Sequence, residues 1–279
     1  RGHATATGQA VSQGANDRFN TAAQAMKAHD DANNGRGDWN PAACNEVADQ
    51  FEDATEAQPN GNFPEAWFNR GIVFERCSMA DRARQSYTRA VEVARNHNYC
   101  RATSMLGVHQ YRANQRGEAQ ATFERAIRED ANCVEAYTNL AMIQRELHTP
   151  EARRLAVGNI RQALARDDKF LPALNQLALT YLDEAGDDPR SQRLFLAGIV
   201  CSQAAQVAGQ TTNNIAPNVR LYVADVYNTW GLIDIRMGQI IRALEHFRRA
   251  FTLNPAMFEA WSNYGTINLS FRGYTDARD

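Results

Sequence analysis

The sequence lacks the features that mark membrane-spanning proteins, β-sheet proteins and most enzymes. No apolar run approaches the length of about eighteen residues that a membrane helix needs, and no segment alternates polar and apolar residues as a half-buried strand does. The serine-nucleophile elbow, the phosphate-binding loop, the dinucleotide-binding glycine pattern and the paired-histidine zinc motif are all missing. We therefore expect no transmembrane segment in this chain, no enzyme activity, no cofactor and no metal.

Lysine is also scarce, because Lys27 and Lys169 are the only two in 279 residues. Positive charge comes almost entirely from arginine and is concentrated between residues 64 and 166, whereas the first 63 residues are acidic. The formal net charge is only −2, and the basic excess of the middle segment is slight. This balance argues against a nucleic-acid partner.

What the chain does contain is a recurring helical pattern, which is clearest between residues 224 and 257. Two short amphipathic helices are predicted there, with facing stripes made of Tyr227, Trp230 and Gly231 in the first and Ala243, Phe247 and Ala250 in the second. Pro255 follows where a helix cannot continue. Glycine and alanine allow two helices to approach closely, while the aromatic rings fill the space between them.

The same pattern recurs along most of the chain with a period of about 34 residues. The units are 17–63, which is degenerate, then 64–97, 100–133, 134–170, 171–212, 216–257 and 258–279. A long second helix is expected with Asp188 as its cap and Pro189 as its first residue, and a long first helix that begins near Pro217 with Asn213 and Asn214 as its caps, each of about twenty residues. The last unit lacks most of its second helix, and residues 1–16 are predicted to be a flexible polar segment.

This pattern resembles the tetratricopeptide repeat (TPR) family in its spacing, its Trp-Gly and Leu-Gly pairs, its alternation of alanine with aromatic residues and its final proline. The resemblance implies an all-α fold, a right-handed α-α solenoid of TPR helix hairpins with about six to seven repeats and the last one truncated. Because each hairpin buries its stripe against its neighbours, we expect residues 17–279 to form a single solenoid. Generic repeat residues also give a loose resemblance to TPR lipoproteins of bacterial envelope machines such as gliding-motility systems.

Five cysteines bear on the cellular compartment. In the repeat geometry that the resemblance implies, Cys44 and Cys77 come from helix ends on one edge, and so do Cys100 and Cys133. Both pairs could then come within the Cα separation of about 4.4–6.8 Å that a disulfide requires. Two disulfides, with Cys201 left as a buried thiol, predict a periplasmic or extracellular location. Five reduced cysteines serving as small apolar residues are the alternative and would fit the cytoplasm.

Two metal sites are weaker alternatives. His97, Cys100 and Cys133 offer three ligands without a recognised spacing, and the acidic segment 183–188 offers carboxylates for calcium. A solvated loop that caps the adjacent helix explains the acidic segment more simply.

In TPR proteins the first helix of each hairpin lines a concave groove that binds extended peptides. The resemblance places the following residues on that groove: Phe68, Asn69, Ile72, Arg76, Arg101, Met105, Val108, Tyr111, Arg112, Asn139, Met142, Arg145, Asn175, Gln176, Leu179, Asn228, Arg236 and Asn263. Amides can pair with a peptide backbone, arginines can capture carboxylates, and the apolar residues add contact area. The groove carries no lysine, so it departs from the carboxylate clamp of chaperone-binding TPRs. A merely solvated face is the alternative.

We therefore expect a non-catalytic scaffold that binds a partner protein or extended peptide in its groove, within a bacterial envelope-associated assembly. Such a protein would be periplasmic, attached to the outer membrane as a lipoprotein, or extracellular. Two alternatives stay open. The chain is a structural subunit that self-associates through its open C-terminal repeat, or a cytoplasmic regulatory module cut from a larger protein.

Overall fold

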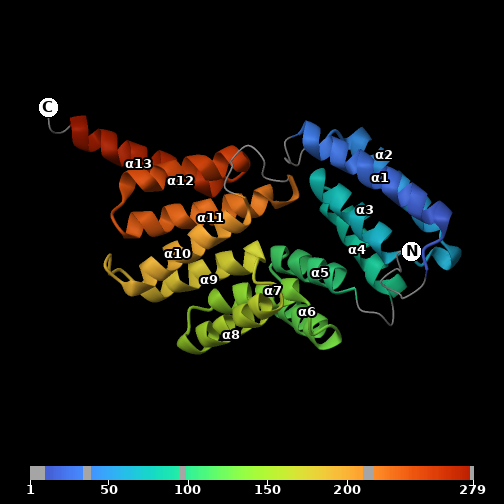
Figure 1. The fold of residues 1–279 in the computed structure, drawn as a ribbon, viewed down its shortest axis with the longest axis horizontal. Helices are drawn as coiled ribbons and strands as arrows, with labels where there is room; N and C mark the ends of the chain where they lie inside the picture. The colour runs from blue at the N-terminus through green and yellow to red at the C-terminus, as the bar shows by residue number, and fades with distance from the viewer. Residues whose placement is uncertain (1–9, 34–38, 95–98, 210–216, 277–279) are drawn as a thin grey trace. The chain divides into compact units, whose positions relative to one another are not determined.

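A computed structural model describes residues 10–33, 39–94, 99–209 and 217–276 of the chain. This part contains thirteen α-helices and a single 3-10 turn, Pro59–Gly61, and no β-sheet (Figure 1). The helices are α1 (Gln13–Ala32), α2 (Pro41–Glu56), α3 (Pro64–Arg76), α4 (Ala80–Ala94), α5 (Cys100–Arg112), α6 (Arg116–Glu129), α7 (Val134–Arg145), α8 (Pro150–Arg166), α9 (Leu171–Ala185), α10 (Gln192–Val207), α11 (Pro217–Arg236), α12 (Ile240–Leu253) and α13 (Phe258–Asp276).

Consecutive helices pack as hairpins, namely α1 with α2, α3 with α4, α5 with α6, α9 with α10, and α11 with α12. Helix α8 follows α7 after a short turn, and α13 is a first helix without a second one in the described residues. The predicted fold class is confirmed: the described residues form an all-α solenoid of helix hairpins.

The chain divides into two compact units, Arg1–Ile143 and Gln144–Asp279. In the first unit α2 packs against α3 and α4 against α5, so each hairpin is covered by the next. In the second unit α8 packs against α9, α9 and α10 against α11, and α12 against α13. Each unit therefore buries its apolar stripes between successive hairpins, as a repeat array does. The single solenoid over residues 17–279 stays a prediction.

A glycine in the first helix packs against an aromatic ring in the second helix of three hairpins. A Cβ atom built on Gly107 would lie 2.6 Å from the Phe123 ring, and one on Gly231 would lie 2.6 Å from the Phe247 ring. Gly71 meets the Tyr87 ring in the same way. These contacts are closer than any side chain allows, so only glycine lets the two helices approach to this distance.

The turn between the two helices of a hairpin uses a left-handed backbone conformation at one recurring position. Ser78, Asn114, His148 and Gly238 have φ values of 55°, 62°, 53° and 73°. Asparagine and glycine adopt this conformation easily, whereas serine and histidine do so at a small energetic cost. The recurrence indicates that the turn geometry, and not the residue type, is what the fold requires.

Two helices begin at other residues than the sequence predicted. Helix α1 starts at Gln13, inside the segment predicted to be flexible, because Ser12 caps it and also donates a hydrogen bond to the Ala57 carbonyl oxygen at 3.0 Å. Helix α10 starts at Gln192 with Ser191 as its cap and has 16 residues. Asp188, which was predicted to cap it, instead closes a turn by accepting from the Arg190 backbone N–H at 3.0 Å.

Helix α11 begins at Pro217, as predicted, and has 20 residues. The asparagines that were predicted to cap it, at 213 and 214, lie outside the described residues, as do residues 1–9 of the predicted flexible segment. Among the described helices, none has the combination of length and apolar character that crossing a membrane requires.

We predict that Gly107→Ala lowers the free energy of unfolding by about 1–3 kcal/mol, because the new methyl group overlaps the Phe123 ring. Gly265→Ala is the matched control: it occupies the same repeat position on α13, but no atom lies within 4 Å of the place that its Cβ atom would take. This substitution should be neutral or raise stability by up to about 1 kcal/mol. Chemical denaturation measures both, and equal effects of the two substitutions would contradict the close contact.

Candidate peptide-binding surface

The residues predicted to line a groove all lie on first helices. Helix α3 carries Phe68, Asn69, Ile72 and Arg76; α5 carries Arg101, Met105, Val108, Tyr111 and Arg112; α7 carries Asn139, Met142 and Arg145; α9 carries Asn175, Gln176 and Leu179; α11 carries Asn228 and Arg236; and α13 carries Asn263. Because the two units divide within α7, the surface is described separately in each unit.

The five arginines of this surface are all paired with carboxylates of the chain itself. The nitrogen–oxygen distances are 2.9 Å for Arg76 and Asp30, 3.6 Å for Arg101 and Glu135, 3.2 Å for Arg112 and Glu75, 2.9 Å for Arg145 and Asp183, and 3.3 Å for Arg236 and Asp187. In each pair the carboxylate comes from another repeat or from its connecting loop. The arginines therefore join successive hairpins.

These pairs differ in how far they are withdrawn from water. The side chains of Arg76 and Arg145 are 20% and 17% exposed, so their pairs are partly desolvated. Arg101, Arg112 and Arg236 are between 45% and 60% exposed, so their pairs contribute little to stability. At Arg76 or Arg145, a partner's carboxylate would have to displace the internal carboxylate. At Arg101, Arg112 and Arg236, the internal carboxylate competes less strongly because the pair is exposed.

Glu75 joins α3 to α5 through the side chains of His109 and Arg112. Its Oε1 atom lies 2.7 Å from Nε2 of His109, a side chain that is 7% exposed, and Arg112 lies on its other oxygen. Burial acts to raise the pKa of Glu75, but the His109 ring and the Arg112 guanidinium outweigh it and hold the pKa below the ordinary value. Sequence reasoning missed Glu75 and His109. The available signal was the presence of opposite charges one repeat apart.

The amides of the surface fall into two groups. Asn69 donates to the Glu65 carbonyl oxygen of its own helix at 2.7 Å, and Gln176 accepts from Arg145 at 3.3 Å. By contrast, the Oδ1 atoms of Asn175 and Asn228 are buried, and no donor reaches them within the described residues. Asn139 and Asn263 are half-buried.

Asn175 and Asn228 occupy the same position of consecutive repeats, and their helices α9 and α11 pack against each other. A buried amide oxygen without a donor costs about 1–3 kcal/mol. These two side chains thus carry unused hydrogen-bonding capacity on one face of the second unit.

The apolar members of the surface are half-buried, with one exception. Phe68 is 4% exposed and packs between the Tyr87 and Tyr99 rings at centroid distances of 5.5 and 5.3 Å, with the Arg101 guanidinium 4.8 Å from its own centroid. Phe68 is therefore a core residue. The half-buried ones are Ile72, Met105, Val108, Tyr111, Met142 and Leu179.

The four cysteines that the repeat geometry placed together form two disulfides. Cys44 on α2 is bonded to Cys77 at the end of α3, and Cys100 at the start of α5 to Cys133 just before α7, with Cα separations of 6.5 and 5.7 Å. Both bonds lie in the first unit: the first links adjacent repeats, and the second joins the two ends of the repeat 100–133. Cys201 is a buried free thiol.

At both alternative metal sites, most candidate ligands already take part in a disulfide or an ion pair within the chain. Cys100 and Cys133 lie near Glu135, but their sulfur atoms are bonded to each other, and His97 lies outside the described residues. In the acidic segment, three of the four carboxylates are paired with arginines: Asp183 with Arg145, Glu184 with Arg193, and Asp187 with Arg236. Within the described part of the chain, neither place offers a set of free ligands for a cation.

We predict that Glu75→Gln lowers the free energy of unfolding at pH 7 by about 1–2 kcal/mol, because Arg112 loses a charge-assisted interaction and His109 loses its contact with a carboxylate. The pKa of Glu75 is lower in the folded chain than in the unfolded one, so its contribution is present above an ordinary pKa of 4.5 and is lost as pH falls through the folded value. Denaturation curves of both proteins should converge in acid. If the difference in unfolding free energy between the two proteins persists unchanged to pH about 3, the lowered pKa of Glu75 is contradicted. Glu56→Gln, at an exposed position, is the control and should change the stability little.

A sequence model of the Tetratricopeptide repeat family matches residues 104–152 of the chain. No curated protein matches it. Among solved structures, a thermophilic TPR protein from Thermus thermophilus is 15% identical with a TM-score of 0.57 over 74% of this chain and 99% of its own. PilW, a widely conserved type IV pilus biogenesis factor, is 18% identical with a TM-score of 0.55 over 90% of this chain and 98% of its own.

The APC/C hetero-tetramer Cut9-Hcn1 contains a chain that is 15% identical, with a TM-score of 0.57 over 80% of this chain and 39% of its own. At these identities the likeness to solved structures concerns the fold. The hairpins, the glycine–ring contacts and the family match agree with one another. The chain shares the fold of tetratricopeptide-repeat proteins, and residues 104–152 carry the sequence pattern of that family.

Proposed function

We propose that this chain is a non-catalytic scaffold that binds a partner protein or an extended peptide along the first helices of its hairpins. The buried, unpaired oxygens of Asn175 and Asn228 carry this proposal. An extended peptide presents backbone N–H and C=O groups at regular intervals, and an asparagine side chain can accept from one and donate to the other. A bound peptide would thus supply the donors that these oxygens do not find among the described residues.

The remaining side chains of this face suit such a ligand. Leu179 lies one helical turn from Asn175 on α9 and is half-buried, so it offers apolar contact beside the amide. The two least exposed arginines, Arg76 and Arg145, are held by internal carboxylates, so they orient the helices and leave recognition to the amides and the apolar residues. A ligand selected mainly through its backbone and its apolar side chains is the expected partner.

For the compartment, we propose a bacterial periplasm or another oxidising location in which the protein belongs to an envelope-associated assembly. Two disulfides support this, because disulfides persist in oxidising compartments and are rare in the cytoplasm. The likeness in fold to PilW, which is described as a pilus biogenesis factor, is compatible with an envelope role.

Self-association is a second candidate function, and the surface of α13 favours it. Phe258 and Leu269 are 77% and 74% exposed, and Trp261 is 48% exposed although its ring stacks on Phe251 at 3.7 Å. Helix α13 packs on α12 on one side, and no second helix of its own follows within the described residues. A second copy stacking there would bury this apolar surface.

Thiol counting tests the proposed compartment. Burial, with a smaller effect of Asp234, raises the pKa of Cys201 well above its ordinary value, so this thiol should not react in the folded protein. For protein isolated from its native host, we expect one reactive thiol after denaturation without reductant and five after reduction. Five reactive thiols before reduction would instead favour the cytoplasmic regulatory module.

Alanine substitution of Asn175 and Asn228 tests the binding face. The double variant should lose at least about tenfold in affinity for the partner captured by cross-linking from the native host. Its free energy of unfolding should be unchanged or rise by about 1–2 kcal/mol, because buried oxygens without donors are removed. Asn20→Ala, at an exposed position on α1, is the matched control.

The outcome of that capture also separates the two candidate functions. A defined partner that is lost in the double variant supports the scaffold. Recovery of only further copies of this chain, unaffected by the double variant, would overturn the proposed face and favour self-association.

A further inference from the structure

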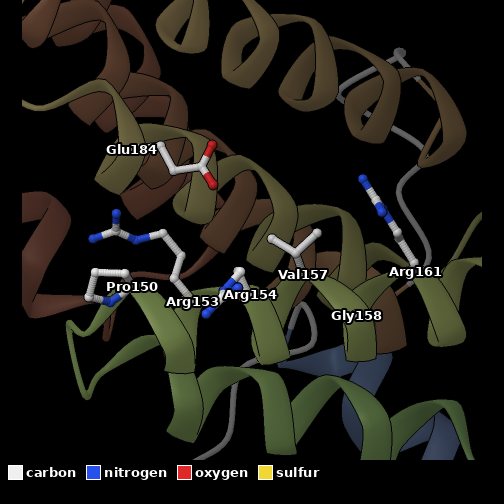
Figure 2. Close-up of a pocket in the computed structure, with 7 residues that line it drawn as sticks. All are labelled: Pro150, Arg153, Arg154, Val157, Gly158, Arg161 and Glu184. Carbon is white, nitrogen blue, oxygen red and sulfur yellow. The ribbon is translucent and has the colours of Figure 1, made fainter.

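An arginine-lined groove runs along one face of α8 in the second unit. Its lining residues are Pro150, Arg153, Arg154, Val157, Gly158 and Arg161, together with Glu184 of α9, and its volume is about 560 Å³ (Figure 2). The residues from α8 follow the spacing i, i+3, i+4, i+7, i+8 and i+11, which places them on a single stripe. This stripe lies on a second helix, apart from the proposed peptide-binding residues on the first helices.

The groove carries uncompensated positive charge. Neither Arg153 nor Arg161 is ion-paired in the part of the chain that the structure describes. Arg154 pairs only with Glu151 of its own helix, and both side chains are more than 65% exposed. The carboxylate opposite the arginines, Glu184, is already held by Arg193 at 3.0 Å. The groove therefore favours an anionic occupant.

Gly158 in the middle of this stripe is not required by any contact among the described residues. No atom lies within 4 Å of the place that its Cβ atom would take, in contrast to Gly71, Gly107 and Gly231, each of which meets a ring. A glycine inside a helix costs about 0.5–1 kcal/mol relative to alanine. Its place between Arg154 and Arg161 provides a notch in which another backbone can approach α8 closely.

The chain itself carries a helix with the complementary pattern. On α2, Glu46, Asp49, Asp53 and Glu56 are all exposed, and none has an ion-pair partner among the described residues. They follow one another at i, i+3, i+7 and i+10, so they form a single acidic stripe. Gln50 beside this stripe has a buried Oε1 atom that no donor reaches in the described residues.

The two stripes match in spacing as well as in charge. Arg154 and Arg161 are seven residues apart, as are Glu46 and Asp53, which corresponds to about 10.5 Å along either helix. A helix laid along the groove can thus bring a carboxylate to the arginines on both sides of Gly158. The planar guanidinium group binds a carboxylate through two parallel hydrogen bonds, which adds direction to the attraction.

We propose that the arginine groove of α8 binds the acidic stripe of α2 from a second copy of this chain. The contact joins two different surfaces, so each assembly of copies retains a free groove at one end and a free acidic stripe at the other. This arrangement produces open chains or closed rings, and it does not depend on the peptide-binding face or on α13. Its strength falls as salt concentration rises, since most of the participating charges are exposed.

The test measures the molar mass of the full chain by sedimentation, from micromolar to near-millimolar concentration and at low and high salt. The wild type should associate at low salt and dissociate at high salt. Arg153→Glu combined with Arg161→Glu should weaken association at least about tenfold, and so should Asp49→Arg combined with Asp53→Arg. Arg248→Glu, at an exposed position on α12, is the matched control and should leave association unchanged.

Mixing the two reversed variants gives the sharpest result. Each should associate more weakly than the wild type when alone, but the mixture should associate with one-to-one composition, because one copy supplies an intact groove and the other an intact acidic stripe. Gly158→Leu should also weaken association without lowering the melting temperature, since no neighbouring atom blocks the new side chain in the free chain.

Three outcomes would overturn the proposal. The first is a wild type that stays monomeric at all concentrations at low salt. The second is an association that both charge reversals leave intact, which would point to another surface such as α13. The third is a mixture of the reversed variants that remains monomeric.

Discussion

The packing of a glycine in one helix against an aromatic ring in the next sets the spacing on which the hairpins depend. Gly107 and Gly231 meet the Phe123 and Phe247 rings at distances that leave no room for a methyl group. Where the first helix has Ala141 or Ala178 at this position, the second helix carries Ile160 or Cys201 in place of a ring. A larger residue in the first helix is thus accompanied by a smaller one in the second. This exchange also accounts for the buried Cys201 thiol.

Fixed hairpins present their first helices at regular intervals, and this arrangement determines how charge is used on them. Arginines one repeat from a carboxylate form ion pairs that join successive hairpins, as Arg76 does with Asp30 and Arg145 with Asp183. The side chains left for a ligand are the amides and the half-buried apolar residues, above all Asn175 and Asn228. Arg153 and Arg161 on α8, which form no ion pair among the described residues, remain available for contacts outside the chain.

The fold could be predicted because its signal is local and repeated: the spacing of glycine, alanine and aromatic residues specifies each hairpin without knowledge of distant parts. The site could be predicted only in part. The first-helix positions were found, but the partners of the arginines were not, because an ion pair depends on side chains of another repeat. Phe68 was assigned to the groove although Tyr87 and Tyr99 enclose it. Capping by Ser12 and Ser191 shifted two helix starts, since a serine cap competes with other polar residues close in sequence.

The central claim is that a partner lies along the inner face of the first helices. Site-specific photo-cross-linking in the native host tests it most directly, with a photoreactive residue in place of Leu179 on α9 and, as the control, in place of the exposed Ile241 on the second helix α12. We predict a covalent adduct with a distinct partner protein from position 179 and none from position 241. Adducts from position 241 alone, or adducts from position 179 that contain only further copies of this chain, would contradict the account.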